Sequence, residues 1–277
     1  MLGVKRTTMA KSFIILGFLF VFSLDSFCQG EKWDVYMANY EKGAGSTVLD
    51  MAFKAKAPLK EYPFLLITGV KVNDCGPDGL PTKKAFDELY KISDKIKSIM
   101  DGSFPNKLVG TFTYQCERVD YYYLTDTTKV REQLDLAYDN NFPKSDKIIK
   151  LQKDSKWDAY ISFLYPNDET LEYMSNQKVI FNLTDAGDKL TKPRKVDHWL
   201  YFKTSTDRDK FAAFIVQKKY KIESKNISEK SNLKYQLQIS RIDLVDLESI
   251  TKITLELRKK ALEFNGDYDG WETYIVK

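Results

Sequence analysis

The chain has 277 residues, of which 43% are hydrophobic and 30% are charged, so it is long enough for one large or two medium globular domains. Its formal net charge is +4, and its lysines are scattered along the sequence rather than gathered in one stretch. This near balance argues against an electrostatic nucleic-acid binder, and no nucleic-acid partner is expected.

The N-terminus has the features of an export signal. Lys5, Arg6 and Lys11 precede an unbroken run of apolar or small residues, FIILGFLFVFSL, at residues 13–24. The run is too short to span a bilayer comfortably but has the length of a signal-peptide core. We therefore predict that residues 1–28 are a signal peptide, and that the mature protein is exported to the periplasm of a bacterium or secreted.

Two small residues, Ser26 and Cys28, are placed for cleavage before Gln29. Lipidation of Cys28 is an alternative, which Asp25 and Phe27 just before it fit poorly. Cleavage would leave a net charge of about +2, because the segment carries more basic than acidic residues. No later stretch is long and apolar enough to cross a bilayer, so no membrane span is expected in the mature protein.

Two cysteines, Cys75 and Cys116, remain after this cleavage. In an oxidising compartment an isolated pair can form a disulfide, and the alternative is two inert buried thiols. Two thiols and the single histidine of the chain, His198, are too few ligands for a zinc site. Neither a metal nor a cofactor is expected.

Residues 29–166 are predicted to form the first domain. Trp33, Val35 and Met37 share one face of a first strand, and turn formers crowd residues 73–81 (NDCGPDGLP). The further elements are expected as strands at 46–53 and 64–72, a helix at 82–100, strands at 108–116 and 119–124, a helix marked by Val130, Leu134 and Ala137, and strands near Ile148 and at Ala159–Leu164.

Three consecutive tyrosines, Tyr121, Tyr122 and Tyr123, must divide between the two faces of their strand. Part of this cluster is expected in the core, and the remainder is free to form an aromatic surface.

The residues Tyr165 to Asp168 (YPND) interrupt the pattern, and residues 167–277 are predicted to form the second domain. Its elements are expected as a short helix at 170–176, a strand at 196–202, a helix capped by Thr206, strands at 220–227 and 235–239, a long helix capped by Asp246, and a last strand at 268–276.

Both domains contain the order β-α-β-β-α-β. The fold class is therefore predicted as α+β, with two tandem ferredoxin-like (βαββαβ) sandwiches built on antiparallel sheets. In this fold the first and second strands run parallel with the third between them. Cys75 follows the first strand of its domain and Cys116 ends the second, so both are expected at the same end of the sheet, within reach of a disulfide.

The most distinctive string of the sequence, GDYDGWET, lies at residues 266–273. Gly266 suits a helix C-terminus that needs a left-handed backbone, and Gly270 permits a second bend. Tyr268 and Trp271 are expected to anchor the last strand to the core.

The same string brings together three carboxylates, Asp267, Asp269 and Glu272. A calcium loop of the EF-hand type would need a glutamate at a position beyond Lys277, which excludes it. A pair of catalytic carboxylates is conceivable, but a structural turn is the favoured interpretation.

His198 lies on the same predicted strand face as Val196, Leu200 and Phe202. A partly buried, hydrogen-bonded histidine is therefore favoured over a catalytic base. No serine or cysteine nucleophile can be paired with it, and glycine-rich phosphate loops are absent. No catalytic residue is assigned.

Two strings carry a resemblance to a known family. GDYDGWET, together with VDHWLYF at residues 196–202, resembles the regulator of ribonuclease activity B family (RraB, ribonuclease E inhibitor B) over residues 167–277. Residues 33–165, with the DGLP turn at residues 78–81, resemble the domain of unknown function 695 family. The first resemblance implies a ferredoxin-like domain and a non-catalytic protein that binds an RNA-degrading endonuclease and lowers its activity.

The leading hypothesis is a bacterial envelope protein that binds a protein partner through its second domain. The candidate binding residues are His198, Trp199, Asp267, Tyr268, Asp269, Trp271 and Glu272. Because an exported protein cannot meet a cytoplasmic ribonuclease, the partner is left open. The alternatives are a cytoplasmic ribonuclease inhibitor, as in the family, and a hydrolase that uses His198 or the three carboxylates, which would have to converge in one pocket.

Overall fold

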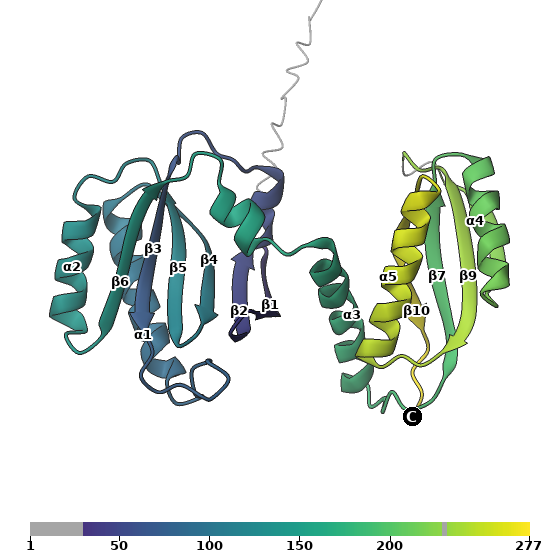
Figure 1. Ribbon diagram of the computed structural model, residues 1–277, viewed down its shortest axis with the longest axis horizontal. Coiled ribbons are helices and arrows are strands. Elements are labelled where there is room, and N and C mark those ends of the chain that lie inside the picture. Colours follow the sequence, from purple (N-terminus) through teal and green to yellow (C-terminus); the bar gives the residue numbers. More distant parts are fainter. Residues whose placement is uncertain (1–29, 229–231) are drawn as a thin grey trace, which may run out of the picture. The chain divides into compact units, whose positions relative to one another are not determined.

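The computed structural model describes residues 30–228 and 232–277. The predicted signal peptide and Cys28 lie outside these residues. The described chain contains a six-stranded and a four-stranded antiparallel sheet with helices, which confirms the predicted α+β fold class (Figure 1). Within the described residues, none of the helices combines the length and the apolar composition that crossing a membrane requires.

The N-terminal sandwich, residues 30–165, is built on a sheet with the strand order β1-β2-β4-β5-β3-β6. Its order β3-α1-β4-β5-α2-β6 is the predicted ferredoxin-like unit, and the hairpin β1–β2 extends the sheet beyond β4 (Figure 1). The strands are β1 Trp33–Tyr40, β2 Gly43–Asp50, β3 Phe64–Lys71, β4 Asn106–Tyr114, β5 Glu117–Leu124 and β6 Asp146–Lys153.

Helices cover both faces of this sheet. On one face, α1 (Phe86–Ser103) and α2 (Val130–Asn141) pack their apolar stripes on residues such as Leu66 and Tyr122. On the other face, η1 (Met51–Ala55) and η2 (Ala159–Leu164) contribute to an aromatic cluster, in which the ring of Trp157 stacks on that of Tyr123 with centroids 3.9 Å apart.

The last predicted strand of this unit is wrong, because Ala159–Leu164 forms one turn of π-helix. Tyr160 and Leu164 are both fully buried, and their spacing of four residues suits a helical turn. The carboxylate of Asp154 holds the turn's start by accepting hydrogen bonds from the backbone N–H groups of Asp158 (2.9 Å) and Ala159 (3.0 Å).

Two predicted boundaries also differ from the structure. The second strand ends at Asp50, since the Asp50 carboxylate caps η1 by accepting from the backbone N–H of Ala52 (2.9 Å). Helix α1 begins at Phe86 and not at residue 82, because Thr82 donates its backbone N–H to the carbonyl of Asp74 (3.0 Å) and so belongs to the preceding loop.

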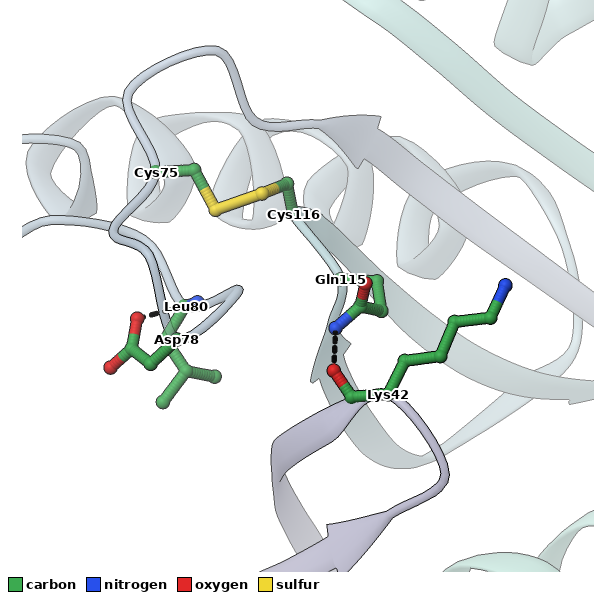
Figure 2. Close-up of a disulfide and its surroundings, with 6 residues drawn as sticks. All are labelled: Lys42, Cys75, Asp78, Leu80, Gln115 and Cys116. Carbon is green, nitrogen blue, oxygen red and sulfur yellow. Dashed lines mark hydrogen bonds between the residues drawn. A yellow bond between two sulfur atoms is a disulfide. The ribbon is translucent and has the colours of Figure 1, made fainter.

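The loop from Asn73 to Ala85 is anchored to the turn between β4 and β5 by the Cys75–Cys116 disulfide (Figure 2). The backbone N–H of Cys116 also donates to the carbonyl of Gly79 at 2.9 Å. The neighbouring Gln115 donates from Nε2 to the carbonyl of Lys42 at 2.6 Å, which ties the β1–β2 turn to the same end of the sheet (Figure 2). Of the two alternatives for these cysteines, the structure contains the disulfide.

The C-terminal sandwich, residues 168–277, is built on a sheet with the order β10-β7-β9-β8, preceded by α3. Its elements are α3 Asp168–Asp185, β7 Arg194–Phe202, α4 Ser205–Gln217, β8 Lys221–Ile227, β9 Tyr235–Asp243, α5 Leu247–Glu263 and β10 Gly266–Thr273. The sequence β7-α4-β8-β9-α5-β10 is again the predicted ferredoxin-like unit. Helix α3 packs against α5 (Figure 1).

Three local predictions for this sandwich need correction. The expected short helix is the first part of α3, which continues to Asp185 and is capped by the Asn167 side chain. Helix α4 is capped by Thr204, whose hydroxyl accepts from the backbone N–H of Asp207 (3.1 Å), and not by Thr206. The predicted cap Asp246 does begin α5, because its carboxylate accepts from the backbone N–H of Ser249 (3.0 Å).

Gly266 does not serve as the helix C-cap. The left-handed residue after α5 is Asn265 (φ 53°), and Gly266 is the first residue of β10. A Cβ atom at Gly266 would lie 2.4 Å from the ring of Phe202, so only glycine lets β10 approach β7 here.

Candidate functional site

Strand β7 presents two different faces to its surroundings. Val196, His198, Leu200 and Phe202 are fully buried on the face that α4 and α5 cover. The side chains between them point to the opposite face, and there Lys195, Asp197, Trp199 and Tyr201 are all partly exposed. The candidate residues therefore divide between a core face and an open face.

His198 is a core residue. Its Nδ1 atom shares a hydrogen bond of 2.9 Å with the hydroxyl of Tyr268, and its ring packs edge-on against Tyr220 with centroids 5.8 Å apart. Its Nε2 atom has no hydrogen-bond partner within the described part of the chain. Burial lowers the pKa of His198 to about 3, and the charge of Arg241 lowers it further, so the imidazole is neutral at physiological pH.

Tyr268 and Trp271 attach the edge strand β10 to the rest of the sandwich. Tyr268 is buried beside His198, and this burial raises the pKa of its hydroxyl well above its usual value. Trp271 donates from Nε1 to the Oδ1 atom of Asn176 on α3, at 2.8 Å. The aromatic residues of the GDYDGWET string therefore connect β10 with β7 on one side and with α3 on the other.

The three carboxylates of the string are exposed, whereas His198 is buried. Asp267 forms an ion pair with Arg258 (3.0 Å) on α5. Asp269 is the extra residue of a β-bulge, since the register with β7 shifts between Tyr268 and Gly270. Glu272 is exposed and lies opposite Asp197 on the open face.

The hydrolase alternative required these groups to converge in one pocket, but the imidazole is fully buried in the core whereas the three carboxylates are exposed. Among residues 30–228 and 232–277, no group of three or more histidine, cysteine, aspartate or glutamate side chains is placed to hold a metal ion.

On the open face of the C-terminal sheet, polar side chains of β9 lie next to the two aromatic residues of β7. Gln236 donates from Nε2 to the hydroxyl of Tyr201 (2.7 Å), and Gln238 donates to the carboxylate of Asp197 (3.2 Å). The register places Gln238 directly opposite Trp199. Because these hydrogen bonds fix the amide groups, the two aromatic residues have ordered polar neighbours.

A charged cluster continues this open face toward β8. The carboxylate of Glu223 accepts from the Ser240 hydroxyl (2.6 Å) and pairs with Lys221 (2.9 Å) and Lys195 (3.2 Å). The hydrogen bond from Ser240, followed by that from Lys221, lowers the pKa of Glu223 to about 2. Beside this cluster is a shallow hollow of about 570 Å³, with the exposed Ile242 in its lining.

Sequence reasoning found Trp199 but missed its neighbours on β8 and β9. The signal was present in YQLQIS at residues 235–240, where Gln236, Gln238 and Ser240 alternate with Leu237 and Ile239. That alternation marks a strand with one apolar and one polar face. The partner of each polar group could not be inferred, because it depends on the register of β9 with β7 and with the bulged strand β8.

Comparison with protein families gives two matches. Residues 174–273 match the family described as Regulator of ribonuclease activity B, and residues 31–165 match a Family of unknown function (DUF695). Both resemblances drawn from the sequence are therefore confirmed, each over its own part of the chain. The first description is that of a regulator and not of an enzyme. Comparison with curated proteins gives no match.

Proposed function

We propose that this chain is a regulatory protein of the bacterial envelope, which binds a protein partner through its C-terminal sandwich and catalyses no reaction. The observation that carries the proposal is the open face of the four-stranded sheet, where Trp199 and Tyr201 are partly exposed beside glutamines whose amide groups are hydrogen-bonded. Tryptophan and tyrosine on a firm, partly polar surface are the residues that most often contribute binding energy at protein interfaces.

Two further observations support parts of this proposal. The match of residues 174–273 to a family of regulators favours binding over catalysis. The Cys75–Cys116 disulfide, together with the basic and apolar segment at residues 1–28, favours an oxidising compartment outside the cytoplasm. The partner is therefore sought among envelope proteins.

The test is affinity capture of the mature protein with extracts of the bacterial envelope, followed by binding measurements with the purified partner. We expect one defined partner with the wild-type chain and at least tenfold weaker binding after W199A combined with Y201A. The matched control is L262A, which truncates an exposed apolar residue of α5 in the same sandwich. Repeated recovery of no partner, or equal binding by both variants, would contradict the proposal.

The second candidate function is the inhibition of a cytoplasmic ribonuclease, which only the description of the matched family favours. Cell fractionation distinguishes the two. The envelope proposal expects a shortened chain outside the cytoplasm, whereas full-length chain in the cytoplasm would favour the inhibitor.

A further inference from the structure

The N-terminal sandwich contains a cavity of about 400 Å³ beside the disulfide-anchored loop. It lies where the end of β3 meets the loop before α1, the first turns of α1 and the turn between α2 and β6. Its volume is within the range of small-molecule sites. It lies in the part of the chain that matches a family of unknown function.

The floor of this cavity is apolar. Val70 in β3, Val72 just after it, and Leu89 and Ile92 of α1 line it, and all four side chains belong to the buried core between the sheet and its two helices. A ligand that reaches this floor therefore replaces water against apolar atoms, which favours an aliphatic or aromatic body.

The rim of the cavity carries charges of both signs. Lys71, Lys84 and Lys144 come from three different segments, and Asp74 and Glu88 come from the loop and from α1. In the described part of the chain none of these five side chains forms an ion pair or a hydrogen bond, whereas many other surface charges of the protein are paired. Both ammonium and carboxylate groups thus stand free around one apolar floor.

This arrangement selects the chemistry of a ligand. A simple anion would use the lysines but leave two carboxylates facing it, and a simple cation would meet three ammonium groups. A zwitterion with an apolar body satisfies both signs at once. We propose that the cavity binds a free amino acid with an apolar side chain, its carboxylate toward the lysines and its ammonium group toward Asp74 and Glu88.

The disulfide supports one wall of this cavity. Asp74 is adjacent to Cys75, and its carbonyl accepts the backbone N–H of Thr82 at 3.0 Å (the disulfide is drawn in Figure 2). The cross-link therefore holds the wall of the cavity that carries Asp74, so that the loop need not be ordered by the ligand.

The test uses isothermal titration calorimetry on the full mature chain, with L-leucine as the probe. Two analogues each lack one charge: 4-methylpentanoate has no ammonium group, and 3-methylbutylamine has no carboxylate. We expect saturable binding of leucine, and at least tenfold weaker binding of either analogue and of glycine, which lacks the apolar body. Absence of leucine binding at millimolar concentration, or equal binding of leucine and both analogues, would overturn the proposal.

Charge-neutralising variants sharpen the test. D74N combined with E88Q is expected to weaken the binding of leucine at least tenfold but not that of 4-methylpentanoate, because the two carboxylates only repel an anion. K84A combined with K144A should weaken the binding of leucine and of 4-methylpentanoate to the same extent. The control K150A removes an exposed lysine of β6, outside the cavity, and should change none of these affinities. Equal losses for all ligands in the first variant would also overturn the assignment.

Discussion

The two sandwiches share one order of elements but cover their sheets differently. In the N-terminal sandwich, α1 and α2 lie on one face while η1, η2 and Trp157 cover the other, so Tyr121, Tyr122 and Tyr123 are all buried. In the C-terminal sandwich, the apolar clusters of the described residues lie on the helix side of the sheet. Its other face keeps Trp199 and Tyr201 half-exposed.

The difference shows that aromatic residues in the same fold are buried or left partly exposed, depending on whether a second layer covers them. The segment that follows β6 provides this layer in the N-terminal sandwich, since Trp157 donates from Nε1 to the Tyr62 carbonyl (3.0 Å) and stacks on Tyr123. In the C-terminal sandwich, the residues after β10 are attached to an ion pair inside the domain. Asp188 and Arg194 form that pair, and the Asp188 carboxylate also accepts the backbone N–H of Val276 at 2.8 Å.

The largest effect is expected from removing the second layer. W157A removes a fully buried side chain and, with it, the stacking on Tyr123 and the hydrogen bond to the Tyr62 carbonyl. We expect a loss of about 3–5 kcal/mol in the free energy of unfolding. Urea unfolding followed by circular dichroism measures this loss. A cost near zero would mean that the layer does not stabilise the N-terminal sandwich, and the comparison of the two sheets would fail.

A smaller but related effect is expected from the cross-link that only the N-terminal sandwich contains. C75S combined with C116S opens a loop of 41 residues, which should cost about 2–4 kcal/mol of unfolding free energy, mainly through the greater entropy of the unfolded chain. Wild-type protein treated with a reductant should lose the same amount. Titration of free thiols in denatured, unreduced protein provides the control, and two reactive thiols per mature chain would contradict the disulfide.

The core of the C-terminal sandwich should show a pH dependence of its own through His198. Burial lowers the folded-state pKa of this histidine to about 3, below its ordinary value of 6.5. Between these two pH values the unfolded chain binds a proton at His198 and the folded chain does not. The stability is therefore fully present above pH 6.5 and is lost as the pH falls toward 3. Between pH 6.5 and 5 the expected loss is about 1.5 kcal/mol.

H198Q is the matched variant for this prediction, because an amide can still bond to Tyr268 but does not titrate. Its unfolding free energy should change by about 1.5 kcal/mol less than that of the wild type over the same pH interval. Parallel curves for the two proteins would mean that His198 is exposed or charged in the folded state.

Much of this architecture could be predicted from the sequence. The β-α-β-β-α-β order follows from the spacing of apolar residues, as in α5, where Ile250, Leu257 and Ala261 form the buried stripe. The prediction failed at Ala159–Leu164, whose apolar residues suit a strand as well as a turn of helix. Its conformation is decided by Asp154, whose carboxylate accepts hydrogen bonds at the start of the turn, and by the packing of Trp157 on the Tyr123 ring. Neither contact has a signal in the local sequence.

The candidate site was predictable only in part, for a related reason. Alternation along β7 correctly separates His198 from Trp199, but both were grouped with the carboxylates because their two strings together carry the family resemblance. The bulge at Asp269 and the paired register of β10 with β7 decide which of these side chains share a face. The three lysines of the N-terminal cavity are far apart in sequence, so their proximity is a property of the fold alone.

The smallest effect on stability is expected on the open face, and it completes the comparison with W157A. W199A removes the same side chain as W157A, but from a sheet face that carries none of the apolar clusters of the described residues, so we expect a cost of about 1 kcal/mol or less in unfolding free energy. Binding of the proposed envelope partner should fall at least tenfold in the same variant, since a partly exposed tryptophan contributes binding energy when a partner buries it fully. Urea unfolding and a binding isotherm on one preparation measure both quantities. If W199A destabilised the fold as strongly as W157A, Trp199 would be a structural residue, and the open face could not be the surface that waits for a partner.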